Sequence, residues 1–445
     1  MSDATLIAKA VYNSANVAEV LIGRGVLAQT GALYQRHFSG PACLIADQNT
    51  WAAAGKAVAA ALQSAGIPFR TYVLPAKPRP KPSVELAEAL QAILAQDDST
   101  PVSIGAGVMN DVVKYAAFQL GRRYLCIATA CSMDGYTSAG APLSDKGFKK
   151  TIQCNPATAV LADLDVLCAA PPEMTGWGYG DLAGKVPAGG DWIIADELGI
   201  EAIDDVAWPL VQNGLNRWLG QPKLIHAADP LAIEGLFTGL TLVGLAMEAH
   251  GSSRPASGAD HQIAHLWEMA DLQLNGERVS HGACVAVGCV ATLRLYDWLL
   301  GQNLRLLNPA AIVAAAPDMA QKTADILAAF GPGEIAARAT EETRAKHIEP
   351  AAHRARLDHL QEIWPPLRRV LRGRLTEAPT MVAMLHQAGS PAEASEIGVD
   401  RAMLRHSILN ARYLRSRYTL LDLLDETGLL QAAVQATVPP DKQDL

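Results

Sequence analysis

Short apolar runs rich in β-branched residues alternate with longer amphipathic segments between Pro41 and Asp165. The longer segments repeat their apolar residues at helical spacing, and the short runs are typical of buried strands. Strands separated by helices run parallel, because each helix returns the chain to the same end of the sheet. The alternation therefore predicts an α/β N-terminal domain with a parallel, Rossmann-like sheet. The predicted strands are ACLIAD, FRTYVL, VSIGAG, YLCIATA and AVLADLDVL.

The first helix expected inside this sheet is the segment NTWAAAGKAVAAALQSAG. Asn49 is the predicted N-cap, because a short polar side chain can accept hydrogen bonds from the first turn. Gly66 is the predicted end of the helix, because glycine adopts the left-handed conformation that terminates helices.

The residue pattern of the chain changes after Pro171 and Pro172. From there to about Asp425, long Ala- and Leu-rich segments replace the β-branched runs, which predicts an all-α domain. We therefore expect two domains, residues 1–170 and residues 171–445. Half of the 445 residues are hydrophobic, enough for a large core.

Charge and cysteine usage favour a small-molecule partner in a reducing compartment. The net charge is -8 and no sustained basic run occurs, which argues against nucleic acid or an anionic membrane as the main partner. The start of the chain, MSDATLIAKAVYNSANVAEVLIG, does not have the basic head and unbroken apolar run of a secretory signal. Seven cysteines in apolar surroundings are typical of core residues. The expectation is a cytoplasmic protein with no membrane partner.

A glycine-containing turn in SIGAGVMNDVVKY joins a predicted strand to a predicted helix. Gly105 and Gly107 would let backbone N–H groups and the positive helix end face a phosphate. In the usual dinucleotide fingerprint an acidic residue follows the glycines by about 20 positions, whereas here Asp47 precedes them. Tight turns without a ligand explain these residues equally well.

The next predicted strand ends in the polar, glycine-rich stretch ATACSMDGYTSAGAP. Ligands of open α/β sheets bind at the carboxyl ends of the strands, where this loop would lie. Thr129 and Ser132 could bond a nucleotide there, and Asp134 would project a carboxylate into the crevice. Several such loops at one edge favour nucleotide binding.

Two histidines four residues apart, His261 and His265, would share one face of a helix in SGADHQIAHLWEM. Asp181 follows a glycine pair in WGYGDLAGK, and His281 begins an apolar helix in SHGACVAVGCV. One carboxylate and two imidazoles, from Asp181, His261 and His281, make the ligand set of a catalytic divalent metal site. The alternative is a helix cap and ordinary buried histidines, and spacing alone leaves both open.

Several of these motifs resemble the glycerol-1-phosphate dehydrogenases, in particular the AraM-like branch of the iron-containing alcohol dehydrogenase and dehydroquinate synthase-like superfamily. The resemblance implies a dehydroquinate synthase-like fold, NAD or NADP as cofactor, and one divalent metal, zinc or nickel. It also implies interconversion of dihydroxyacetone phosphate and sn-glycerol 1-phosphate, a role in phospholipid metabolism, and a homodimer or larger homo-oligomer. The segments that carry it are GAGVMND, ATACSMDGYTSAGAPL, ADLDVL, GDLAGK, SSRPASGADHQIAH, SHGACVAVG and EIGVDRAMLRHSILNARYLRSRYTLLDLL.

The resemblance also implies a role for each position. Asp47 would meet the adenosine ribose. Asp134 and His265 would contact substrate and carry the acid–base chemistry, while Asp181, His261 and His281 would bind the metal, with Asp181 also facing substrate. The pyrophosphate and nicotinamide contacts would come from Gly105, Ala106, Gly107, Val108 and Met109, and from Thr129, Ala130, Cys131, Ser132 and Ser138.

Two features limit the match to the family. The family carries an uninterrupted helix after GDLAGK, whereas Pro187, Gly189 and Gly190 disfavour one here. No residue explicitly marks the phosphate site, and Arg254 in GSSRPASG is the best candidate, with a structural ion pair as the alternative. The alternative functions are those of a sugar-phosphate cyclase, a polyol dehydrogenase, or a catalytically silent protein that binds a nucleotide or a metal.

Overall fold

The computed structural model describes residues 3–145 and 148–439, which form two compact units. Unit 1 combines the N-terminal part of the chain with a later helical segment, and unit 2 is built from the remaining segments. Of the described residues, unit 1 comprises 3–145, 148–182, 205–255 and 387–390, and unit 2 comprises 183–204, 256–386 and 391–439.

Unit 1 contains a six-stranded, fully parallel sheet in the order β1-β8-β5-β4-β2-β3. The predicted parallel sheet is therefore confirmed. Strands β3 and β4 lie on opposite sides of β2, so the strand order reverses there, and the carboxyl ends of β2 and β4 flank the switch point where ligands of such sheets bind. The strands are β1 (Glu19–Gly23), β2 (Ala42–Asp47), β3 (Phe69–Leu74), β4 (Thr100–Gly105), β5 (Leu125–Ala128) and β8 (Ala159–Asp163).

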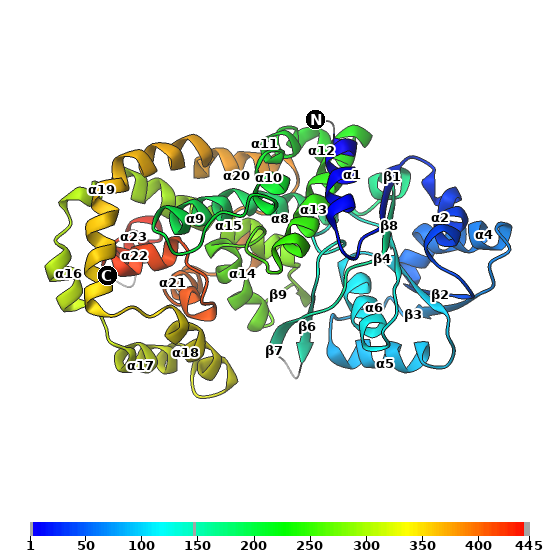
Figure 1. Ribbon diagram of the computed structural model, residues 1–445, viewed down its shortest axis with the longest axis horizontal. Helices are drawn as coiled ribbons and strands as arrows, with labels where there is room; N and C mark the ends of the chain where they lie inside the picture. Colours follow the sequence, from blue (N-terminus) through cyan, green and yellow to red (C-terminus); the bar gives the residue numbers. More distant parts are fainter. Residues whose placement is uncertain (1–2, 146–147, 440–445) are drawn as a thin grey trace. The chain divides into compact units, whose positions relative to one another are not determined.

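Helices cover both faces of this sheet, which explains why its central strands are apolar throughout rather than alternating. The side chains of β2 from Ala42 to Ala46 are fully buried, as are those of β8. Helices α2 and α4 pack together as one pair, and α5 and α6 as another (Figure 1). The helical segments here are α1 (Asp3–Asn13), η1 (Val26–Gln29), α2 (Thr30–His37), α3 (Gln48–Thr50), η2 (Trp51–Gly55), α4 (Lys56–Ser64), α5 (Val84–Leu94), α6 (Gly107–Gln119) and α7 (Leu164–Cys168).

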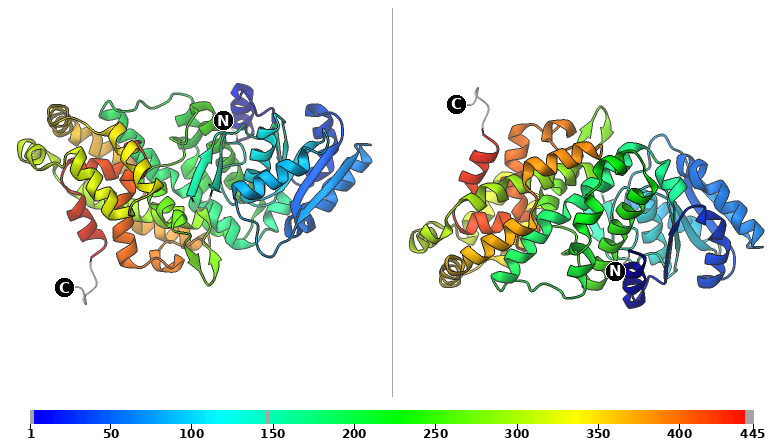
Figure 2. Two further views of the ribbon diagram at one scale, coloured as in Figure 1. Left: turned by 90° about the horizontal axis from the view of Figure 1, so that it is seen from below. Right: turned by 90° about the horizontal axis from the view of Figure 1, so that it is seen from above.

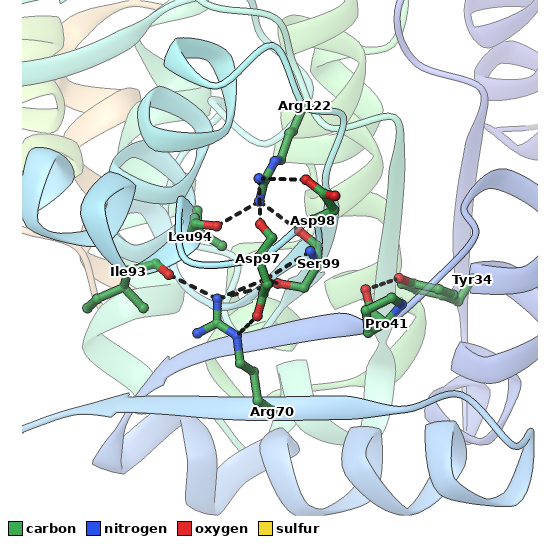
Figure 3. Close-up of polar contacts among 9 residues, drawn as sticks. All are labelled: Tyr34, Pro41, Arg70, Ile93, Leu94, Asp97, Asp98, Ser99 and Arg122. Atoms are coloured by element: carbon green, nitrogen blue, oxygen red, sulfur yellow. Dashed lines mark hydrogen bonds and ion pairs between the residues drawn. The ribbon is translucent and has the colours of Figure 1, made fainter.

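Exposed ion pairs join strands to loops at the amino edge of the sheet (Figure 3). Arg70 Nε on β3 donates to Asp97 Oδ2 at 2.6 Å, in the loop that precedes β4. Hydrogen bonds from Arg70 and Ser99 hold the pKa of Asp97 below its ordinary range. Arg122 donates to the backbone oxygens of Asp97 and Ser99 in the same loop and of Leu94 at the end of α5. These contacts fix the end of the sheet opposite to the ligand edge.

The later segment of unit 1 is helical and includes α13, a 21-residue helix that packs on α1. Helix α13, and α15 in unit 2, are apolar and long enough to cross a membrane by length and composition. In their most apolar windows 72% and 83% of the residues are buried, as in core helices of a folded domain. The remaining elements of unit 1 are α8 (Pro172–Ala183), α10 (Ala207–Gln212), α11 (Leu215–Leu219), α12 (Pro222–His226), α13 (Pro230–His250) and the hairpin of β6 (Ala141–Asp145) and β7 (Phe148–Ile152).

Among its described residues, unit 2 is helical apart from one short hairpin, and the yellow-to-red part of the chain in Figure 2 shows its helices. Its main helices are α9 (Lys185–Glu197), α14 (Ala259–Met269), α15 (His281–Gly301), α16 (Pro309–Ala315), α17 (Met319–Phe330), α18 (Glu334–Lys346), α19 (Pro350–Arg374), α20 (Ala378–Gln387), α21 (Arg401–Asn410), α22 (Leu420–Glu426) and α23 (Leu430–Thr437). Short elements complete it: β9 (Gln273–Leu274), β10 (Glu277–Arg278), η3 (Leu304–Leu306), η4 (Ala394–Ile397) and η5 (Ala411–Leu414).

The expectation that Pro187, Gly189 and Gly190 disfavour a helix is wrong, because all three lie inside α9. The chain instead breaks at Gly184, which separates α8 from α9. Pro187 occupies the third position of α9, where its missing N–H is tolerated. The carbonyl of Ala183, to which an N–H at 187 would have bonded, accepts from Cys289 Sγ at 3.4 Å instead.

Candidate functional site

Asp47 ends β2 at the switch point and caps the short helix α3. Its Oδ1 accepts the backbone N–H groups of Asn49 at 2.8 Å and Thr50 at 2.9 Å, while Thr50 Oγ1 accepts from the Asp47 N–H at 3.0 Å. The predicted N-cap, Asn49, is therefore wrong by two residues. The reciprocal bonds fix the direction of the Asp47 carboxylate.

The turn after β4 is shaped by close contacts that exclude side chains. A Cβ at Gly105 would lie 2.5 Å from Met109 Cβ, and one at Gly107 would lie 2.9 Å from Met133 Cγ. Helix α6 begins at Gly107, and its N-cap, Ala106, provides no side-chain cap. Backbone N–H groups at such a helix start can receive a phosphate.

The loop after β5 lies beside this turn, with the Thr129 N–H donating to the Gly105 carbonyl at 3.2 Å. Tyr136 Oη donates to the Ala130 carbonyl at 2.7 Å, which closes the loop on itself. Burial raises the pKa of the Cys131 thiol, so it stays protonated and is a poor nucleophile. The residues of these two loops that were predicted to contact a nucleotide thus lie at or after the ends of β4 and β5, at the carboxyl edge of one sheet.

Helix α8 approaches this loop closely and carries Asp181. The backbone N–H of Asp134 donates to Asp181 Oδ2 at 3.0 Å, and the Asp181 side chain is fully buried. One turn earlier on α8, a Cβ at Gly178 would lie 1.8 Å from the Cys131 carbonyl oxygen. Only glycine permits this approach. Asp134, predicted to contact substrate, is therefore tied through its backbone to a predicted metal ligand.

Three imidazoles gather in unit 2. His261 and His265 lie on α14 and His281 begins α15, with ring centroids 5.4 to 6.0 Å apart. His261 and His265 share one face of α14, as predicted. The packing of α14 on α15 brings His281 next to them. A Cβ at Gly288 of α15 would lie 2.4 Å from the Asp260 carbonyl oxygen, so glycine is needed for this packing.

Two carboxylates that sequence reasoning missed orient these rings. His261 Nδ1 lies 2.6 Å from Asp260 Oδ2, and His281 Nδ1 lies 2.7 Å from Glu268 Oε1. The second oxygen of Glu268 lies 3.8 Å from His265 Nε2. The available signals were the position of Asp260 directly before His261 and of Glu268 three residues after His265.

Such contacts select the tautomer of the two predicted metal-binding histidines. A neutral imidazole that donates from Nδ1 carries its lone pair on Nε2, the atom that coordinates a metal. A carboxylate partner on the other ring nitrogen is the usual companion of a metal-binding histidine. The donor set of His261 and His281 therefore fits a divalent ion.

A buried carboxylate, Asp191 on α9, fixes the start of the histidine helix. Asp191 Oδ2 accepts the Ala259 N–H at 2.7 Å, and Asp191 Oδ1 accepts from Tyr296 Oη at 2.5 Å and from the Leu420 N–H at 3.0 Å. The Gly258 N–H donates to Asp260 Oδ1 at 3.1 Å. Helices α9, α15 and α22 thus hold the segment that carries His261.

Arg254, the predicted phosphate ligand, lies in the connection that leads from α13 to α14. Its side chain is 1% exposed, and its backbone N–H donates to Ser252 Oγ at 3.1 Å. The geometry supports a role in fixing this connection as readily as a role in binding phosphate.

Comparison with known families and structures shows which proteins share this fold. The family model described as iron-containing alcohol dehydrogenase matches residues 21–171. The structure is similar to that of a probable glycerol dehydrogenase from Sinorhizobium meliloti, with a TM-score of 0.60 at 14% identity, covering 94% of this chain and 98% of that one. It is equally similar to NADH-dependent butanol dehydrogenase A from Thermotoga maritima, with a TM-score of 0.60 at 14% identity and coverage of 93% and 97%. The predicted fold class is confirmed.

Sequence relatives from three bacteria all carry the name of one enzyme, glycerol-1-phosphate dehydrogenase [NAD(P)+]. The chain is 28% identical over 421 residues to the glycerol-1-phosphate dehydrogenase [NAD(P)+] of Bacillus velezensis, covering 94% of this chain and 93% of the relative. It is 28% identical over 419 residues to the protein of the same name from Bacillus subtilis, covering 93% and 92%. With the one from Halalkalibacterium halodurans it shares 34% identity over 255 residues, which is 57% of this chain and 64% of the relative. These similarities confirm the resemblance drawn from the motifs.

Proposed function

We propose that this chain is a metal-dependent NAD(P)H oxidoreductase that interconverts dihydroxyacetone phosphate and sn-glycerol 1-phosphate. The observation that carries the proposal is the cluster of three imidazoles, two of them oriented by carboxylates through Nδ1. It occurs in a chain that is similar over 94% of its length to a glycerol-1-phosphate dehydrogenase.

The proposed metal ligands are Asp181, His261 and His281. Two imidazoles and one carboxylate suit a borderline divalent ion such as zinc or nickel and leave coordination positions for substrate oxygen. When bound, the ion supplies Lewis acidity that stabilises negative charge on the substrate C2 oxygen during hydride transfer.

The chain's own residues position the reactants. We propose that Asp47 receives the adenosine ribose and that the N–H groups from Gly105 to Met109 receive the pyrophosphate. The nicotinamide would lie along Thr129, Ala130, Cys131, Ser132 and Ser138. A carboxylate at the ribose bonds a 2′-hydroxyl and repels a 2′-phosphate, so NADH should give the higher kcat/KM.

Asp134 and His265 are the proposed substrate-side groups. Asp134 is held by its backbone bond to Asp181, and His265 faces the Glu268 carboxylate at 3.8 Å. Imidazole titrates near neutral pH, so His265 is suited to pass a proton to or from the C2 oxygen. Asp134 would orient the substrate hydroxyls.

Arg254 is the proposed phosphate ligand. Loss of a charged contact to phosphate costs about 1.5–3 kcal/mol, which corresponds to a KM for dihydroxyacetone phosphate raised about 10- to 100-fold in Arg254→Ala. The KM for unphosphorylated dihydroxyacetone should change little. Equal losses on both substrates, or an unfolded variant, would assign Arg254 to the structure of its loop.

We also propose that the protein is a homodimer or larger homo-oligomer in the cytoplasm and that its substrate is a phosphorylated triose.

The decisive assay follows NADH oxidation with dihydroxyacetone phosphate, with metal analysis of the same preparation and a stereospecific test of the product. Steady NADH consumption that yields sn-glycerol 1-phosphate is expected. A sugar-phosphate cyclase would show no net NADH consumption, and a polyol dehydrogenase would prefer unphosphorylated substrates. A protein that binds NADH but turns over neither would be catalytically silent.

A further inference from the structure

A lysine on α6, Lys114, is fully buried in unit 1. Its Nζ donates to three backbone carbonyl oxygens of the loop after β5: those of Gly135 at 2.9 Å, Ser138 at 3.1 Å and Gly140 at 3.0 Å. An ammonium has three N–H donors, and the three carbonyls match that number. The loop is therefore wrapped around a positive charge.

The charge of Lys114 is met by three peptide dipoles and by one buried carboxylate. Asp111 Oδ1 lies 3.6 Å from Nζ and forms a buried ion pair with it, at a distance longer than that of an ordinary hydrogen bond. Burying an ammonium is costly unless its donors are satisfied, and a neutral apolar side chain would fill the same space without that cost. A charged residue at this position therefore serves the groups around it, the three loop carbonyls and the Asp111 carboxylate, rather than the filling of the core.

Neighbouring residues reinforce the same arrangement. Asn110 Nδ2 also donates to the Gly135 carbonyl, at 3.2 Å, and Asn110 Oδ1 accepts from Tyr124 Oη at 3.0 Å. Thr137 Oγ1 ties the loop to the Thr241 carbonyl of α13 at 2.7 Å. Among these contacts only Lys114 reaches both ends of the segment from Gly135 to Gly140, which follows Asp134 and contains Ser138.

We propose that Lys114 is a positioning residue whose ammonium sets the loop in the conformation that binds the nicotinamide end of the cofactor. The inference rests on the proposed function, because it uses the proposed roles of Asp134 and Ser138. Lys114 touches neither cofactor nor substrate in this scheme. It acts through the three carbonyls that it collects.

The test compares Lys114→Met and Lys114→Ala in the full-length protein, with NADH affinity measured by fluorescence titration. We expect NADH binding about tenfold weaker in both variants and an unchanged metal content. In Lys114→Ala the vacated space is lined by three carbonyl oxygens, so ammonium chloride at about 0.1 M should restore most of the affinity. In Lys114→Met the longer side chain occupies that space and no rescue should occur. Lys56→Met, which removes an exposed lysine of the same unit, is the matched control and should bind NADH normally.

Several outcomes would overturn the inference. One is a folded Lys114→Met protein that binds NADH within twofold of the wild-type affinity. Another is a Lys114→Ala protein whose NADH affinity ammonium chloride does not restore. If neither variant folds, Asn110→Ala removes a donor to the Gly135 carbonyl and should weaken NADH binding about threefold. An unchanged affinity in that variant would then count against the scheme.

Failure of the proposed function gives a different pattern. A wild-type protein that binds NADH without reducing dihydroxyacetone phosphate refutes the proposed reaction and leaves the NADH comparison intact. If the wild type does not bind NADH, hydrogen exchange decides: Lys114→Met should speed exchange of the amides from Asp134 to Gly140 at least tenfold. Unchanged exchange would reject the role of Lys114.

Discussion

The two units present their proposed ligand groups by different physical means. In unit 1 the turn after β4 offers backbone N–H groups, and glycines at positions 105 and 107 make room for them. The carboxylates of Asp47 and Asp181 are side-chain groups of the same unit. In unit 2 the groups are imidazoles, and their ring positions depend on carboxylates from Asp260 and Glu268. A backbone site is sensitive to added volume, whereas a side-chain site is sensitive to lost charge and hydrogen bonds. Substitutions in the two units should therefore fail in different measurements.

A second contrast lies within unit 1, between the two edges of its sheet. At the amino edge the Arg70 and Asp97 side chains are 31% and 39% exposed, so solvent screens their attraction. At the carboxyl edge Lys114 is fully buried and collects three carbonyls. The exposed pair contributes modestly to stability, and the buried cation shapes a loop.

Removing a proposed metal ligand should have the largest effect. In His261→Ala we expect loss of bound metal and a fall in kcat/KM of at least about 10³-fold, because the C2 oxygen loses its Lewis acid. NADH affinity should stay near that of the wild type, since the loops of unit 1 are intact. Elemental analysis and fluorescence titration measure the two effects, and a variant that is fully active in metal-free buffer would refute the proposed site.

The carboxylates that orient the imidazoles should come next. Asp260→Asn and Glu268→Gln keep the size of each side chain but remove its charge. Partners of metal-bound histidines typically contribute 10- to 100-fold in metal affinity, so a loss of about that size is expected. Competition with a chromophoric chelator measures it. If both variants bind metal as tightly as the wild type, the carboxylates serve only the packing of α14 and α15.

Adding volume to the backbone site should give the opposite pattern. In Gly105→Ala the new methyl would lie 2.5 Å from Met109 Cβ, so the turn must shift away from its position before α6. We expect NADH binding about tenfold weaker, equivalent to about 1.4 kcal/mol, with normal metal content. Gly301→Ala is the control, because nothing lies within 4 Å of a Cβ added there. Equal effects of the two substitutions would remove the distinction between the units.

The exposed pair at the amino edge should show the smallest effect. Because the pKa of Asp97 is lowered in the folded protein, its contribution is present above the ordinary value of 3.8 and is lost as the pH falls through the folded value. Asp97→Asn should therefore reduce the free energy of unfolding by about 0.5–1 kcal/mol at pH 7. Urea denaturation should show this difference shrinking below about pH 4. A difference that is constant with pH would mean that the charge of Asp97 is not its source.

The parallel sheet, its two glycine-containing loops and the histidines could be predicted from the sequence, whereas the carboxylates that contact the histidines could not. Periodicity predicted the parallel strands because buried strands between helices are apolar on both faces. Helical spacing placed His261 and His265 on one face, and the motif resemblance linked them with His281. The sequence did not indicate that Asp260 and Glu268 contact the histidines. An acidic residue beside a histidine is common, and only the packing of the helices shows where its carboxylate lies.

Local capping was the least predictable feature. Asn49 and Asp47 are both good N-cap residues, and the choice between them depends on where β2 ends, which pairing with β3 determines. Pro187 was read as a helix breaker, yet at the third position of α9 it is compatible with the helix. In both cases the residue type was recognised and its position relative to the element boundary was not.

The sequence by itself determined five of the six parallel strands, the glycines of the two loops and the identity of the histidines, because these follow from local periodicity and side-chain chemistry. It did not indicate strand β1 or the hairpin of β6 and β7. Only the tertiary structure decided which atoms meet. The fully buried Lys114 collects carbonyls of the loop after β5, 21 to 26 residues further along the chain, and Asp191 caps α14 from 68 residues away. Such contacts depend on how helices pack against one another and against a loop, and a single sequence carries no record of that geometry.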